Sequence, residues 1–104
     1  MPIQQPTPQE LSQARAASLV ARRARADLKR EIHDGAKTVR QALMAAYGDE
    51  ALRQLRVIDV VRSVPGVGQV RATKTMERLG IALNRRVGGL GSRQFEALSE
   101  EFDA

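Results

Sequence analysis

Two glycine-containing turns interrupt the helical spacing of this chain and constrain its fold more than any other feature. The first lies in SVPGVGQV, residues 63–70, and the second in GGLG, residues 88–91. Proline fixes one backbone angle, and glycine permits backbone conformations that other residues avoid. Each turn therefore ends one element and redirects the chain, which predicts helices packed across sharp turns.

Around these turns, apolar residues recur every three or four positions, as in amphipathic helices. The first helix begins with the capping box TPQE, with Thr7 as its N-cap, and is expected to end at Gly35, with an apolar stripe made mostly of alanine. Further helices are expected over 38–47, 49–63 and 69–79, and from the N-cap Ser92 to 102. The run RVIDVV also suits a strand, but no partner strand exists elsewhere, so the sequence predicts an all-α fold.

The same spacing selects the residues expected to face the core. They include Val64, Val67, Val70, Thr73, Met76 and Leu79 around the first turn, and Tyr47, Phe95 and Phe102 in other helices. Aromatic side chains buried in this way do not stack on unpaired bases, which disfavours a reader of single-stranded nucleic acid.

Composition excludes several classes of protein. The chain has 104 residues and no cysteine, so one folding unit is expected, without disulfides or thiolate metal sites. Within it, we expect an extension and long basic helix over 1–35 and a compact helical domain over 36–104. The longest apolar run, ALMAAY, is far too short to span a membrane, and the first residues do not resemble a secretory signal.

The charge of the chain is basic and unevenly distributed. The formal net charge is +5 and the pI is about 10.7. Between residues 62 and 93 there is one acid, Glu77, among seven basic residues: Arg62, Arg71, Lys74, Arg78, Arg85, Arg86 and Arg93. A neutral surface intersperses both signs, so this distribution favours a polyanionic partner over a solvated helix face.

The first turn does not fit either common nucleotide-binding loop. A dinucleotide fingerprint needs a third glycine where Arg71 stands, and a Walker loop needs Gly-Lys followed by Ser or Thr. A turn that opens the helix over 69–79 does offer free backbone amides and a helix dipole to a phosphate. Arg71 and Lys74, one helical turn along, add full charge to that anion site. The alternative is a turn without a ligand.

The residues SVPGVGQVRA (63–72) resemble a helix-hairpin-helix motif, whose pattern is apolar-Pro-Gly-apolar-Gly-x-x-x-Ala. That motif binds the DNA backbone through its hairpin amides. Three further features extend the resemblance: RRVGGLGSRQ (85–94), MERLGI and the Ala/Arg-rich first helix. Together they make the chain closely resemble the actinobacterial integration host factor family. That family comprises small nucleoid-associated proteins with a long N-terminal helix and an S13-like helix-two-turn-helix (H2TH) domain. The resemblance implies sequence-tolerant binding of duplex DNA, bending and compaction of DNA, effects on supercoiling, recombination and transcription, and a cytoplasmic, nucleoid location.

Carried over by position, the resemblance implies two contacts with the DNA backbone. The first would be formed by Gly66, Val67, Gly68, Arg71 and Lys74, and the second by Arg85, Arg86, the loop from Gly89 through Gly91 to Ser92, Arg93 and Gln94. The family often reads Arg-Arg-x-Arg-Gly-Leu-Gly, whereas this chain has Gly88 in place of the last arginine. We expect Arg93 to restore that charge.

An enzyme is the first alternative, because DNA glycosylases with an N-terminal proline nucleophile also contain an H2TH domain, and Pro2 becomes N-terminal once Met1 is removed. However, Ile3 stands where that family has an acid, and a β-sandwich domain and zinc-finger cysteines are missing. His33, beside Asp34, is expected on the surface. We therefore expect no catalytic site, no cofactor, no metal site and no small-molecule substrate.

Two binding alternatives remain open. Small-subunit ribosomal proteins share the two-turn architecture, so structured RNA is an alternative ligand, and the alanine stripe of the first helix is an alternative docking face for a protein. The basic face of that helix, with Arg22, Arg23 and Arg25, would touch the same duplex or a second one. We expect a monomer that binds double-stranded DNA and no membrane.

Overall fold

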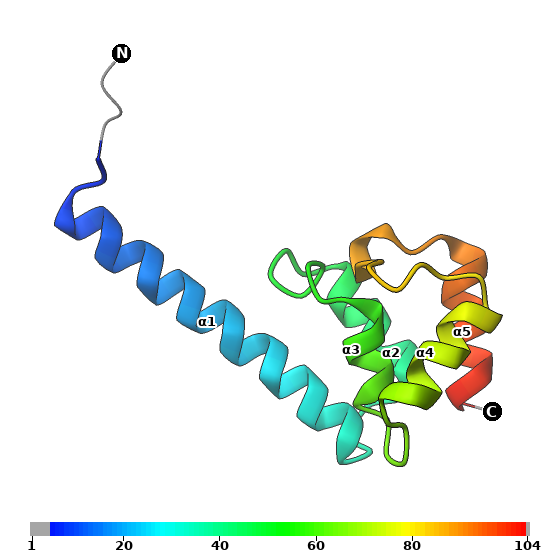
Figure 1. Ribbon diagram of the computed structural model, residues 1–104. Helices are drawn as coiled ribbons and strands as arrows, with labels where there is room; N and C mark the ends of the chain where they lie inside the picture. Colours follow the sequence, from blue (N-terminus) through cyan, green and yellow to red (C-terminus); the bar gives the residue numbers. More distant parts are fainter. Residues whose placement is uncertain (1–4, 104) are drawn as a thin grey trace.

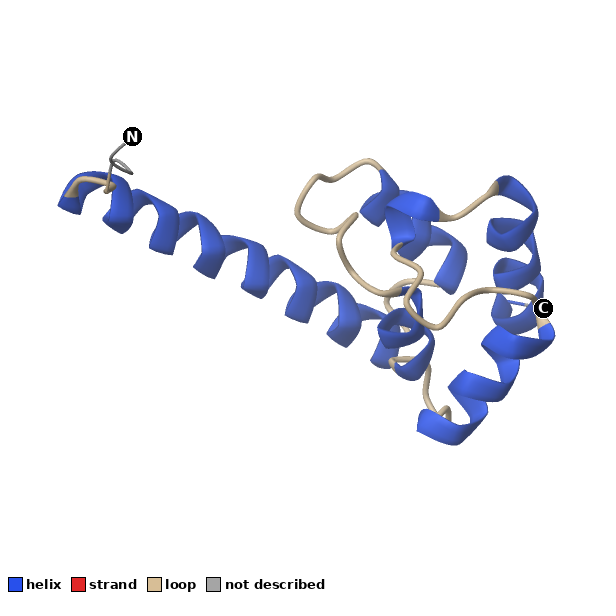
Figure 2. Ribbon diagram, turned by 45° about the horizontal axis from the view of Figure 1, so that its top comes forward, coloured by secondary structure: helices blue, strands red, loops and turns tan. Residues whose placement is uncertain are grey.

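The structure is a computed structural model that describes residues 5–103, and these residues form helices joined by turns (Figures 1 and 2). No strand occurs among them beyond a single bridged residue pair, so the expectation of an all-α fold is confirmed. The elements are α1 (Pro8–His33), α2 (Val39–Tyr47), α3 (Val57–Arg62), α4 (Gln69–Arg78), the 3-10 turn η1 (Val87–Gly89) and α5 (Ser92–Asp103). Pro2 and Ile3, which bear on the glycosylase alternative, lie outside the described residues.

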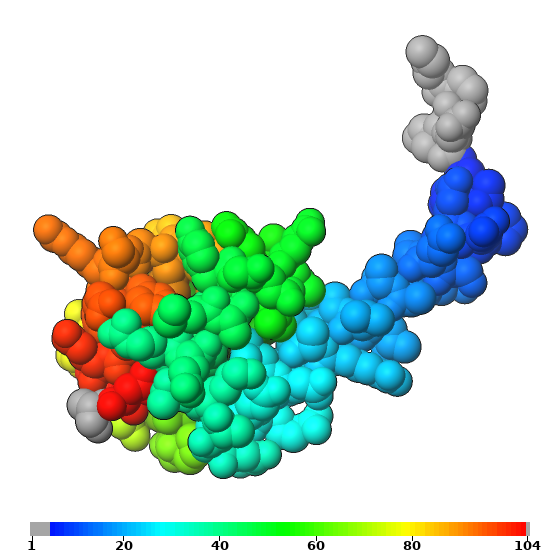
Figure 3. All heavy atoms as spheres, turned by 180° about the vertical axis from the view of Figure 1, so that it is seen from behind, coloured from blue at the N-terminus to red at the C-terminus, as the bar shows by residue number. Residues whose placement is uncertain are grey.

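Helix α1 projects from the rest of the molecule (Figures 1 and 3). Its predicted capping box is present, because the Thr7 hydroxyl accepts from the Glu10 amide and the Glu10 carboxylate accepts from the Thr7 amide. Only Leu28 and Ile32 of its 26 residues are buried, and residues 8–20 are exposed throughout. The alanine stripe therefore packs against the body only near the C-terminal end of the helix.

The core lies where the four shorter helices meet the last turns of α1. Helix α2 packs mainly on α5, and α3 packs on α4. The largest side chains with almost no exposed surface are Leu43, Met76, Leu98, Val57, Val60, Val61 and Val87. Val87 comes from η1 and Leu90 also packs against this core, so these two side chains anchor the second turn.

The prediction of a helix over 49–63 is wrong for its first half. Residues 49–55 form turns, because the Asp49 carboxylate accepts hydrogen bonds from the amides of Ala51 and Leu52 and bends the chain there. Arg56 then forms an isolated antiparallel bridge with Arg86 before α3 begins. Within this segment, Arg56 alone forms the strand-type pairing that the β-branched residues suggested.

Three further expectations are corrected. Val70 is 67% exposed, because Ala72, Thr75 and Met76 form the buried face of α4. Tyr47 is 50% exposed, because its ring lies under the Arg53 guanidinium instead of in the core.

Ser92 is the first residue of α5 rather than its N-cap: the Gly91 carbonyl accepts from the Phe95 amide, which makes Gly91 the cap. Phe95 and Phe102 pack against the core as expected, although both are partly exposed.

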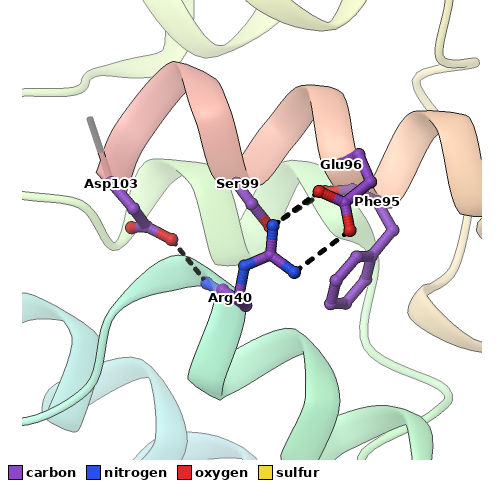
Figure 4. Close-up of polar contacts among 5 residues, drawn as sticks. All are labelled: Arg40, Phe95, Glu96, Ser99 and Asp103. Carbon is purple, nitrogen blue, oxygen red and sulfur yellow. Dashed lines mark hydrogen bonds and ion pairs between the residues drawn. The ribbon is translucent and has the colours of Figure 1, made fainter.

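A polar clamp joins the ends of α2 and α5 (Figure 4). The Asp103 carboxylate accepts from the backbone amides of Val39 and Arg40, at 2.9 and 2.8 Å, and so caps α2 from the far end of the chain. The Arg40 guanidinium donates to both carboxylate oxygens of Glu96, at 3.1 and 2.6 Å, and lies over the Phe95 ring. This hydrogen-bonded pair raises the pKa of Arg40 and lowers the pKa of Glu96.

Candidate nucleic-acid interface

The first turn, residues 63–68, connects α3 to α4. Gly66 has φ of +79°, a left-handed conformation that favours glycine, so the turn requires glycine at this position. Gly68 has φ of −90° and ψ of −174°, which any residue can adopt, so the expectation that its conformation requires glycine is wrong. A Cβ atom at Gly68 would meet nothing within 4 Å, so its backbone faces open space.

Helix α4 begins without a cap. Its N-cap residue, Gly68, has no side chain, and no hydrogen bond within residues 5–103 uses the amides of Gln69, Val70 or Arg71. The N-termini of α1 and α2, by contrast, are closed by capping boxes. Free amides at a helix N-terminus form an anion site because they point outward and carry the positive end of the helix dipole.

Basic side chains surround this open N-terminus. Gly68, Arg71, Lys74 and Arg78 line one open depression of about 630 Å³. Arg78 is ion-paired with Glu101, whereas Arg71 and Lys74 are exposed and have no acidic partner within the described part of the chain. The structure thus brings the amides and both predicted cations of the first turn to one place.

The second turn is built differently, because its amides are already bonded. The Val87 amide donates to Leu55, the Gly88 amide to Arg53, the Gly89 amide to Arg86 and the Leu90 amide to Val87, each to a backbone carbonyl at 2.9–3.1 Å. The Gly91 amide donates to the Gln94 side-chain oxygen at 3.2 Å. The amides of residues 87–91 are therefore occupied, whereas no hydrogen bond within residues 5–103 uses the amides of Ser92, Arg93 or Gln94 at the start of α5.

The residues of the second turn that were predicted to bind DNA are of two kinds: some are exposed, and others form hydrogen bonds within the fold. Arg86 donates to the Gln54 carbonyl and remains exposed, and Ser92 and Arg93 are also exposed. Arg85 donates to the Gly89 carbonyl at 3.1 Å, and its Nε is buried without a hydrogen-bond partner. Gln94 also donates to the Gly80 carbonyl at 3.3 Å, so it links the end of α4 to the start of α5.

A basic groove lies where α1 approaches the second turn. Its volume is about 530 Å³, and its charged lining residues are Arg22, Arg25, Lys29, Arg56, Arg86 and one acid, Asp59. Arg25 also donates to the Ala51 carbonyl at 3.4 Å, which ties α1 to the turn before α3. Of the three predicted α1 residues, Arg22 and Arg25 therefore share a groove with the second turn, whereas Arg23 does not line it. Sequence reasoning did not select Arg56.

The two turns lie at opposite ends of α3. Six helical residues rise about 9 Å, which sets the scale of their separation. The surface between them is also basic: Lys29, Arg62 and Ser63 line a small hollow together with Asp59, which lies 3.7 Å from Arg62. A largely basic surface thus runs from the second turn, past α3 and α1, to the first turn.

The described residues were also compared with what a metal site or a membrane span requires. Within residues 5–103, no group of three or more His, Cys, Asp and Glu side chains could hold a metal ion. His33 is exposed, as expected. No helix among the same residues is long and apolar enough to cross a membrane.

Comparison with known proteins places the chain in a family. Residues 32–102 match the family model described as the S13-like H2TH domain. The chain is 43% identical over 100 residues to the integration host factor of Mycolicibacterium smegmatis, covering 92% of this chain and 95% of that protein. The integration host factor of Streptomyces coelicolor is 36% identical over 96 residues, covering 92% and 90%. The chain belongs to the integration host factor family. The expected long helix followed by an H2TH domain is thereby confirmed.

A solved structure is similar over most of the chain. It is the structure of sIHF bound to an 8-base-pair palindromic DNA, with a TM-score of 0.81 and 37% sequence identity. The match covers 84% of this chain and 98% of that one. This member of the integration host factor family thus shares its fold with a relative solved on duplex DNA.

Proposed function

We propose that this protein binds the phosphate backbone of duplex DNA with little sequence preference. The observation on which the proposal rests is the uncapped N-terminus of α4 beside Arg71 and Lys74, two cations with no acidic partner in the described part of the chain. Amides and cations recognise phosphate but carry no information about base sequence. The solved complex of sIHF with DNA supports duplex DNA as the source of that phosphate.

We further propose that both turns and the α1 groove bind one duplex as one surface. Arg22 and Arg25 share their groove with Arg86, which places α1 beside the second turn rather than on an opposite face. A monomer would then contact one duplex through residues 36–104 and through Arg22 and Arg25 of the 1–35 extension. Binding at several points of the backbone is suited to bending and compacting DNA in the cytoplasmic nucleoid. Such binding would affect supercoiling, recombination and transcription. It requires no catalysis.

Fluorescence anisotropy over a range of salt concentrations tests the proposal. The ligands are one duplex DNA in two sequences, a single strand and a structured RNA. About 4–6 neutralised phosphates predict a slope of about −4 to −5 for log affinity against log salt on duplex DNA. The two duplex sequences should bind about equally. Tighter binding to the structured RNA, or a slope near zero, would contradict a DNA-backbone function.

A charge-matched pair of variants assigns the binding to the first turn. Gly68→Glu places a carboxylate beside the free amides and should abolish duplex binding, because it competes with phosphate for the same positive site. Ala45→Glu makes the same change in charge at an exposed position of α2 and should leave binding within about twofold of wild type. Equal losses in both variants would indicate a general charge effect instead of a site at the first turn.

A further inference from the structure

Arg53 is held at three points beside the second turn. Its Nη1 donates to the Tyr47 carbonyl at 3.2 Å, and its Nη2 donates to the Gly88 carbonyl at 3.4 Å. Its guanidinium carbon lies 4.7 Å from the centre of the Tyr47 ring. A stacked guanidinium held by two carbonyls is fixed in advance, so little side-chain entropy remains to be lost when it binds a ligand.

The Arg53 side chain occupies the space into which a side chain at position 88 would project. A Cβ atom at position 88 would lie 3.0 Å from the Arg53 Nε and 3.3 Å from the Arg53 Cβ. The φ angle of Gly88 is not positive, so the backbone itself does not require glycine there. Positions 53 and 88 therefore share one side-chain space, and Arg53 fills it.

The charge of Arg53 is not balanced by an acid among residues 5–103. None of the ion pairs within the described range includes Arg53, Arg85 or Arg86. These three arginines instead donate to the carbonyls of Gly88, Gly89 and Gln54, which leaves their net charges in place. Like charges gathered around one turn repel one another unless an anion lies among them.

We propose that Arg53 is a further DNA-binding arginine beside the second turn and donates to a backbone phosphate. This inference rests on the proposed function and extends it to a residue outside the glycine turns. The guanidinium has five donors, of which the two carbonyls use two, so it retains donors for a phosphate oxygen. Arg53 thus supplies a cation at the point where the backbone at Gly88 has no side chain.

The test removes the charge of Arg53 and compares it with a distant arginine. Arg53→Gln should weaken duplex binding about 3- to 10-fold and reduce the magnitude of the salt slope by about 1, the loss of one phosphate contact. Arg15→Gln, on the outer half of α1, should change the slope by less than about 0.3, because a distant surface charge is screened. An unchanged slope and affinity in a folded Arg53→Gln variant would overturn the proposal.

A charge-swap pair separates phosphate binding from simple folding. Gly88→Arg alone should lower the melting temperature, because two arginines compete for one space. Arg53→Ala combined with Gly88→Arg should restore both the melting temperature and the salt slope, since a cation again occupies the turn. Restored stability without restored slope would overturn the proposal. If Gly68→Glu abolishes binding while the Arg53 variants bind normally, the proposed function stands and this inference alone fails.

Discussion

Gly66 and Gly68 lie two residues apart in the first turn, yet their backbones differ. Gly66 has positive φ, and a side chain there is strained in the left-handed region whatever space surrounds it. Gly68 has an ordinary backbone and open space around it. The first glycine therefore serves the fold, and the second leaves the amides of α4 accessible.

Alanine substitutions should separate these two roles. Gly66→Ala should lower the free energy of unfolding by about 1–2 kcal/mol, the cost of placing a Cβ in the left-handed region. Gly68→Ala should change it by less than about 0.5 kcal/mol, because its backbone and surroundings admit a Cβ. Urea unfolding followed by circular dichroism measures both. Equal losses would show that the two glycines have the same structural role.

At the residue scale, the sequence predicted local features well and long-range contacts poorly. The capping box at Thr7 and the turn-forming role of Gly66 depend on residues within a few positions of each other, so they could be predicted. Arg53 was missed because its partner Gly88 is 35 positions away and no spacing rule connects them. Tyr47 was assigned to the core for a different reason: its partner Arg53 is only six positions away, but helical spacing alone does not show that an arginine covers the ring.

At the scale of elements, contacts between helices that are far apart in the sequence hold the domain together. Asp103, in the last turn of α5, caps the N-terminus of α2, and Arg40 of α2 donates to Glu96 of α5. The segment over 49–55 shows the limit of prediction at this scale. Its apolar residues Leu52 and Leu55 are buried at helical spacing, but the Asp49 carboxylate and pairing with the second turn replace the helix.

Removing the Asp103 cap should destabilise the domain. Asp103→Ala loses two hydrogen bonds and a negative charge at the N-terminus of α2, which should cost about 1–2 kcal/mol in the free energy of unfolding. Asp34→Ala, another exposed aspartate whose side chain accepts no hydrogen bond among those described, is the control and should change it by less than about 0.5 kcal/mol. The two variants are compared by urea unfolding at neutral pH. Similar values for both would refute the capping role.

The pair between Arg40 and Glu96 should make part of the stability depend on pH. Because the pKa of Glu96 is lowered in the folded state, its contribution is fully present above the ordinary glutamate pKa and is lost as the pH falls through the lower folded value. Wild type should therefore exceed Glu96→Gln in melting temperature by a constant amount between about pH 6 and 8. The difference should shrink below about pH 4.3. A constant difference down to pH 2 would contradict this origin.

At the scale of the whole molecule, a largely basic surface, with Asp59 as its acid, extends from the α1 groove along α3 toward the first turn. Arg22 and Arg25 line the groove with Arg86, whereas Arg15 and Arg23 do not. The sequence identified α1 as basic, but which of its arginines approach the body depends on where Leu28 and Ile32 dock in the core. Helix orientation of this kind is set by tertiary packing.

Two double variants with the same change in charge test which face of α1 binds. Arg22→Glu with Arg25→Glu should weaken binding to a single duplex at least about tenfold, because two cations of the groove are reversed. Arg15→Glu with Arg23→Glu should weaken it less than about threefold. Anisotropy measures the affinity, and a pull-down of one labelled duplex by another measures bridging. Loss of bridging in the second variant alone would show that α1 binds a separate duplex.

The exposed outer half of α1 has a consequence for the energetics of the free protein. Residues 8–20 form no buried contacts, and an isolated helix of about a dozen residues is only marginally stable in water. Backbone amides there should exchange with deuterium far faster than those near Leu28 and Ile32, whose opening requires disruption of the core. Duplex DNA that bound this segment would have to supply the free energy of ordering it, and slower exchange over 8–20 in the complex would record that coupling of folding to binding.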